Sequence, residues 1–433
     1  MAKEKAVTAF PRPKGPAVTG IGVLAPTGLS TAEHWDSVLA GKSGIGRITR
    51  FDPSGYPVQL AGELPGFEKG TVPGRLVPQT DRWTHIGLTA AQQALADAGV
   101  DPARRPEYEM AVVTSSSSGG TEFGQHEMTK LYTGGPSHVG AYQSIAWFYA
   151  ATTGQISILH GMRGPCGVVA CEQAGGLESL RQAGRLLSQG IGLVVAGGTD
   201  GSLCPYGLTA QIANGMVSEA TDPTKAYAPF DAEASGYLPG EGGAIFVLED
   251  YDSALARGAP VYGTVAGYGA GFDPPPGSPR PPALRRVIEL ALADAGIQAA
   301  DIDVVFADAM GVPAADRAEA RALTEVFGPH GTPVTAPKTL TGRLYGGGSS
   351  LDVATALLAL RDDTVPATAA TSQLAPGCED LDIVLGEPRC RPLHTALVVA
   401  RGYGGFTAAV VLRSSGPGSA PVTAESEQKG KNE

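Results

Sequence analysis

The chain has 433 residues, of which 42% are hydrophobic and 17% charged, and its 32 Lys and Arg against 43 Asp and Glu give a net charge of −11. This composition excludes a chain that is disordered throughout, and the length suggests two or three domain-sized units. The acidic balance, without a basic stripe, argues against a nucleic-acid partner, and no stretch is apolar enough to predict a membrane helix.

The first residues, MAKEKAVTAFPRPKGP, contain no apolar segment typical of a signal peptide, and the five cysteines are scattered without a metal-ligand spacing. These features favour a reducing, cytoplasmic location and predict no metal site. Residues 1–15 are expected to form a flexible N-terminus. The Ser-, Gly- and Pro-rich segment 414–433 is expected to be a disordered tail.

The first half of the chain alternates apolar strands with amphipathic helices. Residues 17–23 predict a buried strand, and residues 82–98 carry apolar side chains at helical spacing. A short strand is predicted at 111–114, and a loop of serine and glycine follows at 115–120.

A second group of elements surrounds a tight turn. A strand is predicted at 167–171, a turn at 172–174 and a helix from 175 to about 189. Buried strands are predicted at 192–198 and 242–249.

The rhythm of strands and helices begins again after residue 256. The predicted strands are 261–265, 304–307 and 396–400, and the predicted helices are 282–295, 314–326 and 351–360. Alternation in both halves predicts an α/β architecture with an internal duplication. The expected units are an N-terminal half, 16–256, and a C-terminal half, 257–413.

The turn at 172–174 has the pattern of a nucleophile elbow. A helix that starts at Gly175 directs free N–H groups toward the turn, where they favour developing negative charge. Acyl transfer requires Ser or Cys at the tip, but the tip residue is Gln173, whose neutral amide is a poor nucleophile. Cys171 is expected to lie inside the strand, as a small buried hydrophobe and not as a catalytic thiol.

Four segments together carry a resemblance to a known family. They are VTGIGVLAPTG near the start, PFDAEASGYLPGEGGAIFVLE at 229–249, PKTLTGRLYGGG at 337–348 and GYGGF at 402–406. Through them, residues 16–413 resemble the ketosynthase family. The resemblance implies a thiolase-like fold, with a duplicated αβαβα core and two mixed sheets sandwiched by helices.

The resemblance also implies that the family's catalytic positions are replaced here. The family's nucleophilic Cys falls on Gln173, its two catalytic His residues fall on Asp308 and Arg343, and its Lys is retained as Lys338. Condensation needs a thiolate and two imidazoles, so the chain is not expected to condense alone. Since the two His residues are neighbours in the family, Asp308 and Arg343 are expected to form an ion pair.

Gln173 within the segment EQAGGL, and the segment 141–165, resemble the chain length factor, the beta subunit of type II aromatic polyketide ketosynthases of antibiotic biosynthesis. The resemblance implies a heterodimer with an active ketosynthase alpha subunit and a shared tunnel for a growing poly-β-ketone. It implies substrates on the phosphopantetheine arm of an acyl carrier protein and no cofactor bound by this chain. Because carrier proteins and this chain are both acidic, docking is expected mainly on the alpha subunit.

Two interpretations of Gln173 stay open. In the first, its amide N–H₂ donates a hydrogen bond to a thioester carbonyl and aids decarboxylation of malonyl groups. In the second, the side chain only fills the space that a thiol left.

Thr121, Gly124 and Met128 follow the Ser-Gly loop at a spacing that places them on one helix face. By the resemblance, this face ends the tunnel at the heterodimer interface, where large aromatic side chains stop the growing chain early. The small or flexible residues here predict a deep tunnel and a long product, decaketide or longer. In the alternative interpretation, the three residues only pack the interface.

Two other functions remain as alternatives. One is an autonomous condensing enzyme or decarboxylase with an atypical site, against which the loss of three catalytic positions argues. The other is a chain length factor for a reduced polyene, which the gate residues do not exclude.

Overall fold

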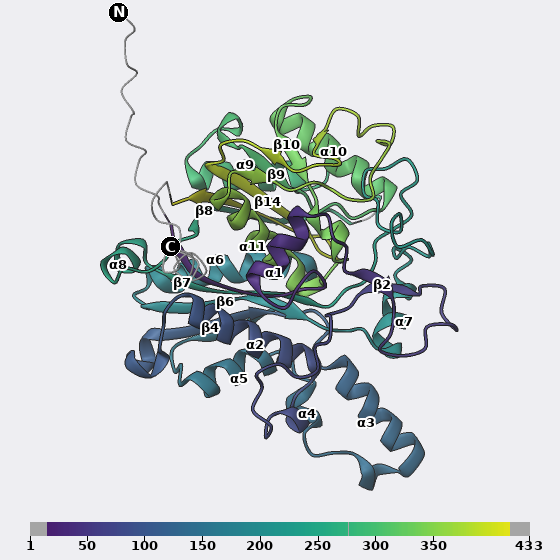
Figure 1. Cartoon of the computed structure of the whole chain (residues 1–433), viewed down its shortest axis with the longest axis vertical. Coiled ribbons are helices and arrows are strands. Elements are labelled where there is room, and N and C mark those ends of the chain that lie inside the picture. The colour runs from purple at the N-terminus through teal and green to yellow at the C-terminus, as the bar shows by residue number, and fades with distance from the viewer. Residues whose placement is uncertain (1–14, 276, 416–433) are drawn as a thin grey trace, which may run out of the picture.

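The computed structural model describes residues 15–275 and 277–415, which fold into five layers that are stacked from bottom to top in Figure 1. Two helices cover each outer face, two sheet halves lie inside them, and two helices fill the centre. From bottom to top these helices are α2 (Arg82–Asp97) with α5 (Ala151–His160), α6 (Gly175–Ser188) with α11 (Gly348–Arg361), and α9 (Leu284–Ala295) with α10 (Pro313–Phe327).

The two sheet halves repeat one strand order. The strands of the first half are β1 (Ala17–Leu24), β4 (Met110–Ser115), β5 (Cys166–Val169), β6 (Leu193–Asp200) and β7 (Gly242–Glu249). Those of the second half are β8 (Gly263–Phe272), β9 (Val304–Phe306), β10 (Pro333–Thr335), β12 (Asp382–Ile383), β14 (Thr395–Arg401) and β15 (Phe406–Ser414).

The first half is ordered β5-β4-β6-β7-β1 and the second β10-β9-β14-β15-β8, with β12 added beyond β10. In each half the first three strands run parallel and the last two pair antiparallel. This repeated topology confirms the internal duplication, and the two mixed sheets that were expected are the two halves of the sheet.

The two halves also meet edge to edge. Ala17 pairs with Thr264 and Val18 with Gly263, so β1 and β8 join the halves into one sheet of 11 strands. The boundary expected at residue 256 coincides with the end of α8 (Tyr251–Ala256). Ser414 belongs to β15 and not to the predicted tail, while most of the segments 1–15 and 414–433 lies outside the described residues.

Helix packing on both sheets depends on glycine. A Cβ on Gly22 of β1 would lie 2.0 Å from the carbonyl oxygen of Ala90 in α2, and one on Gly269 of β8 would lie 2.1 Å from that of Val287 in α9. Neither position has room for a side chain, so α2 and α9 approach their strands closely at equivalent places of the two halves.

The central helix α11 is buried on every side, as its apolar sequence predicts. It positions the site, because its N-terminus points toward the turn that precedes α6. Further helices are α1 (Thr31–Leu39), α3 (Thr121–Gly134), α4 (Gln143–Ala146) and α7 (Pro205–Ala213), and short ribbons pair β2 (Ile45–Arg47) with β3 (Leu60–Gly62) and β11 (Thr364–Val365) with β13 (Arg389–Cys390).

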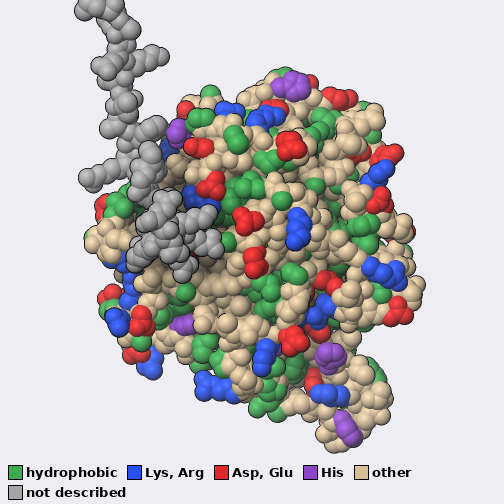
Figure 2. Space-filling view, viewed as in Figure 1, with side chains coloured by type: hydrophobic (Ala, Val, Ile, Leu, Met, Phe, Trp, Pro, Cys, Tyr) green, Lys and Arg blue, Asp and Glu red, His purple; other side chains and the backbone are tan. Residues whose placement is uncertain are grey.

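Within the described part of the chain, no helix combines the length and the apolar character needed to cross a bilayer. On the face in Figure 2, Lys and Arg side chains are interspersed with Asp and Glu and form no basic stripe.

Candidate functional site

Gln173 lies in the turn between β5 and α6, where the sequence predicts an elbow. Glu172 before it has a left-handed backbone, with φ of 47°, which is uncommon for a residue with a side chain. The Gln173 side chain is fully buried, and its Nε2 would lie 2.3 Å from a Cβ on Gly348, the first residue of α11. Neither amide atom has a hydrogen-bond partner among the described residues. The elbow therefore holds an enclosed amide where a nucleophile would stand.

The prediction for Cys171 is wrong in its position. Strand β5 ends at Val169, so Cys171 lies just before the turn and not inside the strand. The side chain is half-buried, and burial raises the pKa of its thiol, helped by the nearby Glu178 carboxylate. A thiol that stays protonated is a weak nucleophile, which agrees with the expected non-catalytic role.

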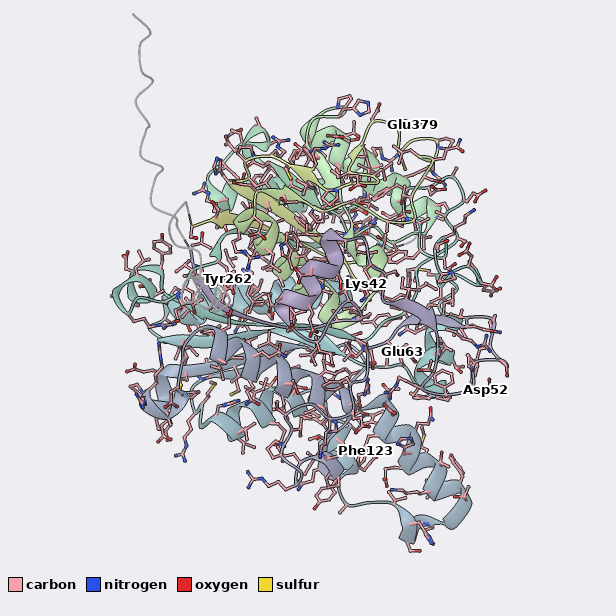
Figure 3. The ribbon with its side chains drawn as sticks, in the orientation of Figure 1. Lys42, Asp52, Glu63, Phe123, Tyr262 and Glu379 are labelled. Carbon is pink, nitrogen blue, oxygen red and sulfur yellow. The ribbon has the colours of Figure 1, made fainter. Side chains whose placement is uncertain are left out.

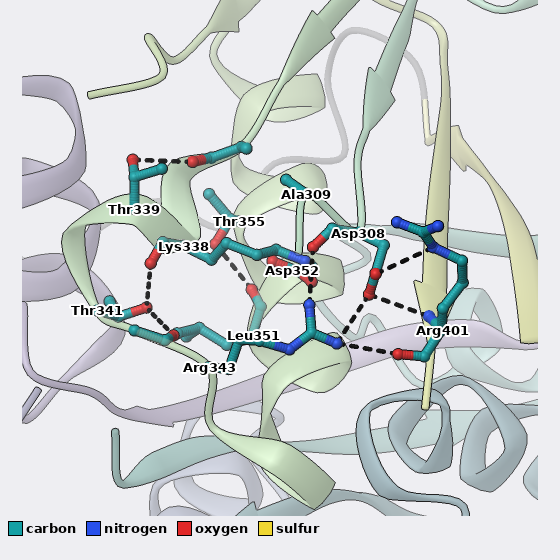
Figure 4. A network of polar contacts seen from close by, with 12 residues as sticks. Asp308, Ala309, Lys338, Thr339, Thr341, Arg343, Leu351, Asp352, Thr355 and Arg401 are labelled. Atoms are coloured by element: carbon teal, nitrogen blue, oxygen red, sulfur yellow. Dashed lines mark hydrogen bonds and ion pairs between the residues drawn. The ribbon is translucent and has the colours of Figure 1, made fainter. Parts of the chain in front are cut away.

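Asp308 and Arg343 form the ion pair that the resemblance led us to expect (Figure 4). Arg343 donates from Nη2 to Asp308 Oδ1 at 3.1 Å and from Nη1 to the Asp308 carbonyl oxygen at 3.1 Å. It also donates from Nη2 to the carbonyl oxygen of Arg401 at 2.9 Å, and its guanidinium lies 5.5 Å from the ring centre of Tyr237. Arg343 is only 2% exposed, so this pair is part of the core.

Arg401, at the end of β14, is a member of the network that the sequence analysis missed. Its Nε donates to Asp308 Oδ2 at 3.2 Å and its Nη2 to Glu319 Oε2 at 2.7 Å. Glu319 in turn accepts from the backbone N–H groups of Asp308 and Ala309, at 2.7 and 2.9 Å. The available signal was a lone arginine that ends an otherwise apolar strand, LVVAR.

Lys338 is paired as well. Its Nζ lies 2.7 Å from Asp352 Oδ2 on α11, and both side chains are nearly fully buried. Lys338 therefore ties the turn Pro337–Leu340 to the central helix (Figure 4).

The electrostatics of this network do not suit proton transfer. Burial opposes ionisation of Asp308, but Arg343, Arg401 and Lys338 outweigh it and hold the pKa of that carboxyl well below its usual range. Arg343 stays a fixed cation at every relevant pH. Since neither group changes its charge near neutral pH, the pair cannot exchange protons as two imidazoles do.

The three residues predicted to end the tunnel lie on α3, which begins at Thr121, so the stretch is helical as their spacing requires. Thr121 and Gly124 are buried, and Met128 is half-buried. The space beside Gly124 is not empty, because a Cβ there would lie 2.0 Å from Cζ3 of Trp147. In this chain as folded, the volume beside Gly124 is therefore taken by the Trp147 indole.

Asp81 holds the first turn of α3, a contact that the sequence analysis also missed. Its Oδ1 accepts from the N–H of Trp83 at 3.3 Å as the N-cap of α2, and its Oδ2 accepts from the N–H of Phe123 at 2.6 Å. The N-cap of α3 is Gly120, which has no side chain to accept, so Asp81 caps both helices. Figure 3 places Phe123 where α3 meets the body of the molecule.

Comparisons with known proteins agree with this geometry. The pattern described as "Beta-ketoacyl synthase, N-terminal domain" matches residues 16–254, and "Beta-ketoacyl synthase, C-terminal domain" matches residues 262–372. The chain is 57% identical over 402 residues to the tetracenomycin polyketide synthase ketoacyl synthase beta subunit of Streptomyces glaucescens, which covers 92% of this chain and 98% of that protein.

Two solved structures are also similar. The ishigamide ketosynthase/chain length factor is 27% identical with a TM-score of 0.85, and the match covers 93% of this chain and 100% of that one. A beta-ketoacyl synthase from Burkholderia phymatum is 25% identical with a TM-score of 0.85, over 93% and 99% of the two chains.

Proposed function

The chain belongs to the beta-ketoacyl synthase family, and from this we propose that it is a non-condensing beta subunit, a chain length factor, of a type II polyketide synthase. The observation that carries the proposal is the replacement of all three catalytic positions. Gln173, Asp308 and Arg343 are buried, and the last two neutralise each other inside the protein. A site of this kind has no nucleophile and no titrating base for condensation.

A partner subunit is supported by an exposed apolar face. Strand β5 is the last strand of the sheet and, within residues 15–275 and 277–415, pairs only with β4, so its outer edge is open to another chain. Helices α3 and α4 project from the body at the lower right of Figure 1, and α5 packs beside α2 and β5. The exposed apolar side chains of these helices, of the residues that flank α4 and of β5 include Tyr132, Tyr142, Ile145, Trp147, Phe148, Ile158 and Val168.

A monomer that leaves such a face exposed tends to associate. We infer that an active ketosynthase alpha subunit covers it and that the two chains share the polyketide tunnel, with α3 at its end. Malonyl and polyketidyl groups then arrive on the phosphopantetheine arm of an acyl carrier protein, which docks mainly on the alpha subunit because this chain is acidic.

The amide of Gln173 is both unpaired and buried. The missing partner favours a role in decarboxylation, and the burial favours a side chain that only fills space. The unpaired Nε2 is free to donate to a thioester carbonyl, but no surface of the side chain is exposed, so substrate reaches it only if α11 or the elbow moves. We favour the role of a filler. Gln173→Ala in the complex then leaves release of CO₂ from malonyl-loaded carrier protein unchanged, whereas a marked loss would assign Gln173 to decarboxylation.

The decisive experiment is reconstitution with malonyl-loaded carrier protein. Product mass is measured with this chain alone, with the ketosynthase alpha subunit alone, and with both. We expect a full-length polyketide, decaketide or longer, only from the mixture. Carbon–carbon bond formation by this chain alone would overturn the proposal and support an autonomous condensing enzyme.

A further inference from the structure

Three glycines at the start of α3 form a seat for Trp147. A Cβ on Gly124 would lie 2.0 Å from Cζ3 and 2.2 Å from Cε3 of the indole, and one on Gly120 would lie 2.0 Å from the carbonyl oxygen of Ala146. Gly119 is left-handed, with φ of 58°, and a Cβ on it would lie 2.9 Å from the Trp147 carbonyl oxygen. No side chain fits at these positions while Trp147 stays in place. We call Gly119, Gly120 and Gly124 the glycine seat.

Backbone contacts fix Trp147 on this seat. The N–H of Gly120 donates to the Trp147 carbonyl oxygen at 3.3 Å, and the N–H of Trp147 donates to the carbonyl oxygen of Gln143 at 3.2 Å, which ends α4. The residue is therefore held from α3 on one side and from α4 on the other. An indole has few rotatable bonds, so a ring held in this way is a rigid wall.

The other side of the indole stays open. Trp147 is 41% exposed in this chain, whereas the other two tryptophans, Trp35 and Trp83, are 4% and 0% exposed. Trp147 thus presents a large apolar surface on the face where we place the partner subunit. It meets α3 between Thr121 and Met128, which lie one turn before and one turn after Gly124 on the same helix face.

Phe123, the aromatic residue in the first turn of α3, lies away from Trp147. It lines a separate cavity of about 340 Å³, together with Asp81, Thr80 and His85. It therefore does not compete with Trp147 for the face that carries Gly124.

We propose that Trp147, held by the glycine seat, is the specificity-determining residue that limits the length of the poly-β-ketone. This inference rests on the proposed function and deepens it. The indole occupies the volume that an aromatic side chain on α3 would occupy. Beside Gly124 the tunnel is bounded by the indole that follows α4, and the glycine makes room for that indole. The same volume becomes free for the growing chain when the indole is removed.

The test compares variants of this chain in complex with its ketosynthase, supplied with malonyl-loaded carrier protein. Trp147→Ala is expected to lengthen the longest product by at least one two-carbon unit, and Trp147→Phe, a milder change, by less. The matched control is Phe148→Ala, which removes an adjacent aromatic ring that is 60% exposed and is expected to leave product length unchanged. Size-exclusion chromatography verifies that each variant still forms the complex.

A second readout does not depend on activity. Because Trp35 and Trp83 are buried, quenching of tryptophan fluorescence by acrylamide in this chain reports mainly on Trp147. Gly124→Ala is expected to push the indole off the seat and to increase quenching.

The outcomes separate this inference from the function on which it rests. If the wild-type mixture makes no polyketide, the proposed function fails. If it makes one and both Trp147 variants give the same product mass, the inference is overturned while the proposed function stands. Unchanged quenching in Gly124→Ala would show that the seat does not hold the indole.

Discussion

Replacing Arg343 by methionine tests whether the buried charge network stabilises the fold. The substitution keeps an unbranched side chain and removes three hydrogen bonds. They run to the carbonyl oxygen of Asp308 at 3.1 Å, to Asp308 Oδ1 at 3.1 Å and to the carbonyl oxygen of Arg401 at 2.9 Å. Asp308 keeps Arg401 as a partner, but its buried carboxyl loses the guanidinium that contributes most to lowering its pKa. Removal of one partner from a buried ion pair typically costs about 3–5 kcal/mol of unfolding free energy.

Arg389→Met is the matched control. Arg389 forms an ion pair with one carboxylate as Arg343 does, with hydrogen bonds of 2.6 and 3.0 Å to Asp382, but its side chain is 40% exposed. Exposed pairs contribute about 1 kcal/mol or less, since water and salt screen the charges. Both variants break an Arg–Asp ion pair, and only the pair broken by Arg343→Met is buried.

The assay is urea denaturation of the complex, followed by circular dichroism at one protein concentration, because association shifts the apparent stability. We expect a much larger fall of the unfolding midpoint for Arg343→Met than for Arg389→Met. Equal shifts would refute the reasoning. Adding Asp308→Asn to Arg343→Met tests the cause: if the stranded charge is responsible, the second substitution costs less in this background than in the wild type.

Three further predictions concern other parts of the chain. Burial raises the pKa of Asp81 from 3.8 to about 7. The free energy of unfolding therefore falls as pH rises from about 4 to about 7, because the buried carboxyl must ionise, and this contribution changes no further above pH 7. Asp81→Asn should therefore reduce the fall in melting temperature between pH 5 and pH 7.5, and an unchanged fall would contradict the shift. Gln173→Cys should react with iodoacetamide far more slowly than the exposed Cys390, because position 173 is fully buried; equal labelling rates by mass spectrometry would show that the elbow opens. Val168→Lys places a charge on the open edge of β5 and should weaken the heterodimer at least tenfold by analytical ultracentrifugation, unless the partner subunit binds elsewhere.

The α/β alternation was predictable because each strand and helix is marked by local spacing of apolar residues. The predicted helix at 82–98 corresponds to α2, and the predicted strand at 192–198 to β6. The boundaries around the turn were harder. The apolar run after Gly167 continues to Cys171 in the sequence, but the pairing of β5 with β4 ends at Val169. The end of a short edge strand depends on this pairing, which the apolar pattern does not show.

The site could be predicted only in part. Gln173, Lys338, Asp308 and Arg343 were found through motifs that the family resemblance supplied. Arg401 was missed because it meets Asp308 across 93 residues of sequence and belongs to none of the quoted segments.

The gate shows the same limit. Helical spacing correctly placed Thr121, Gly124 and Met128 on one face of a helix, but spacing says nothing about what packs there. The volume that Gly124 leaves is taken by Trp147, more than twenty residues later in the chain.

The order of elements, the duplication and the loss of a nucleophile follow from residue identity and from periodicity along the chain, so they could be predicted before folding. Which charges neutralise one another, and which side chain fills the space beside α3, depends on the folded chain. Burial makes an unpaired charge and an empty volume costly, and the groups that satisfy them come from segments that only folding brings together.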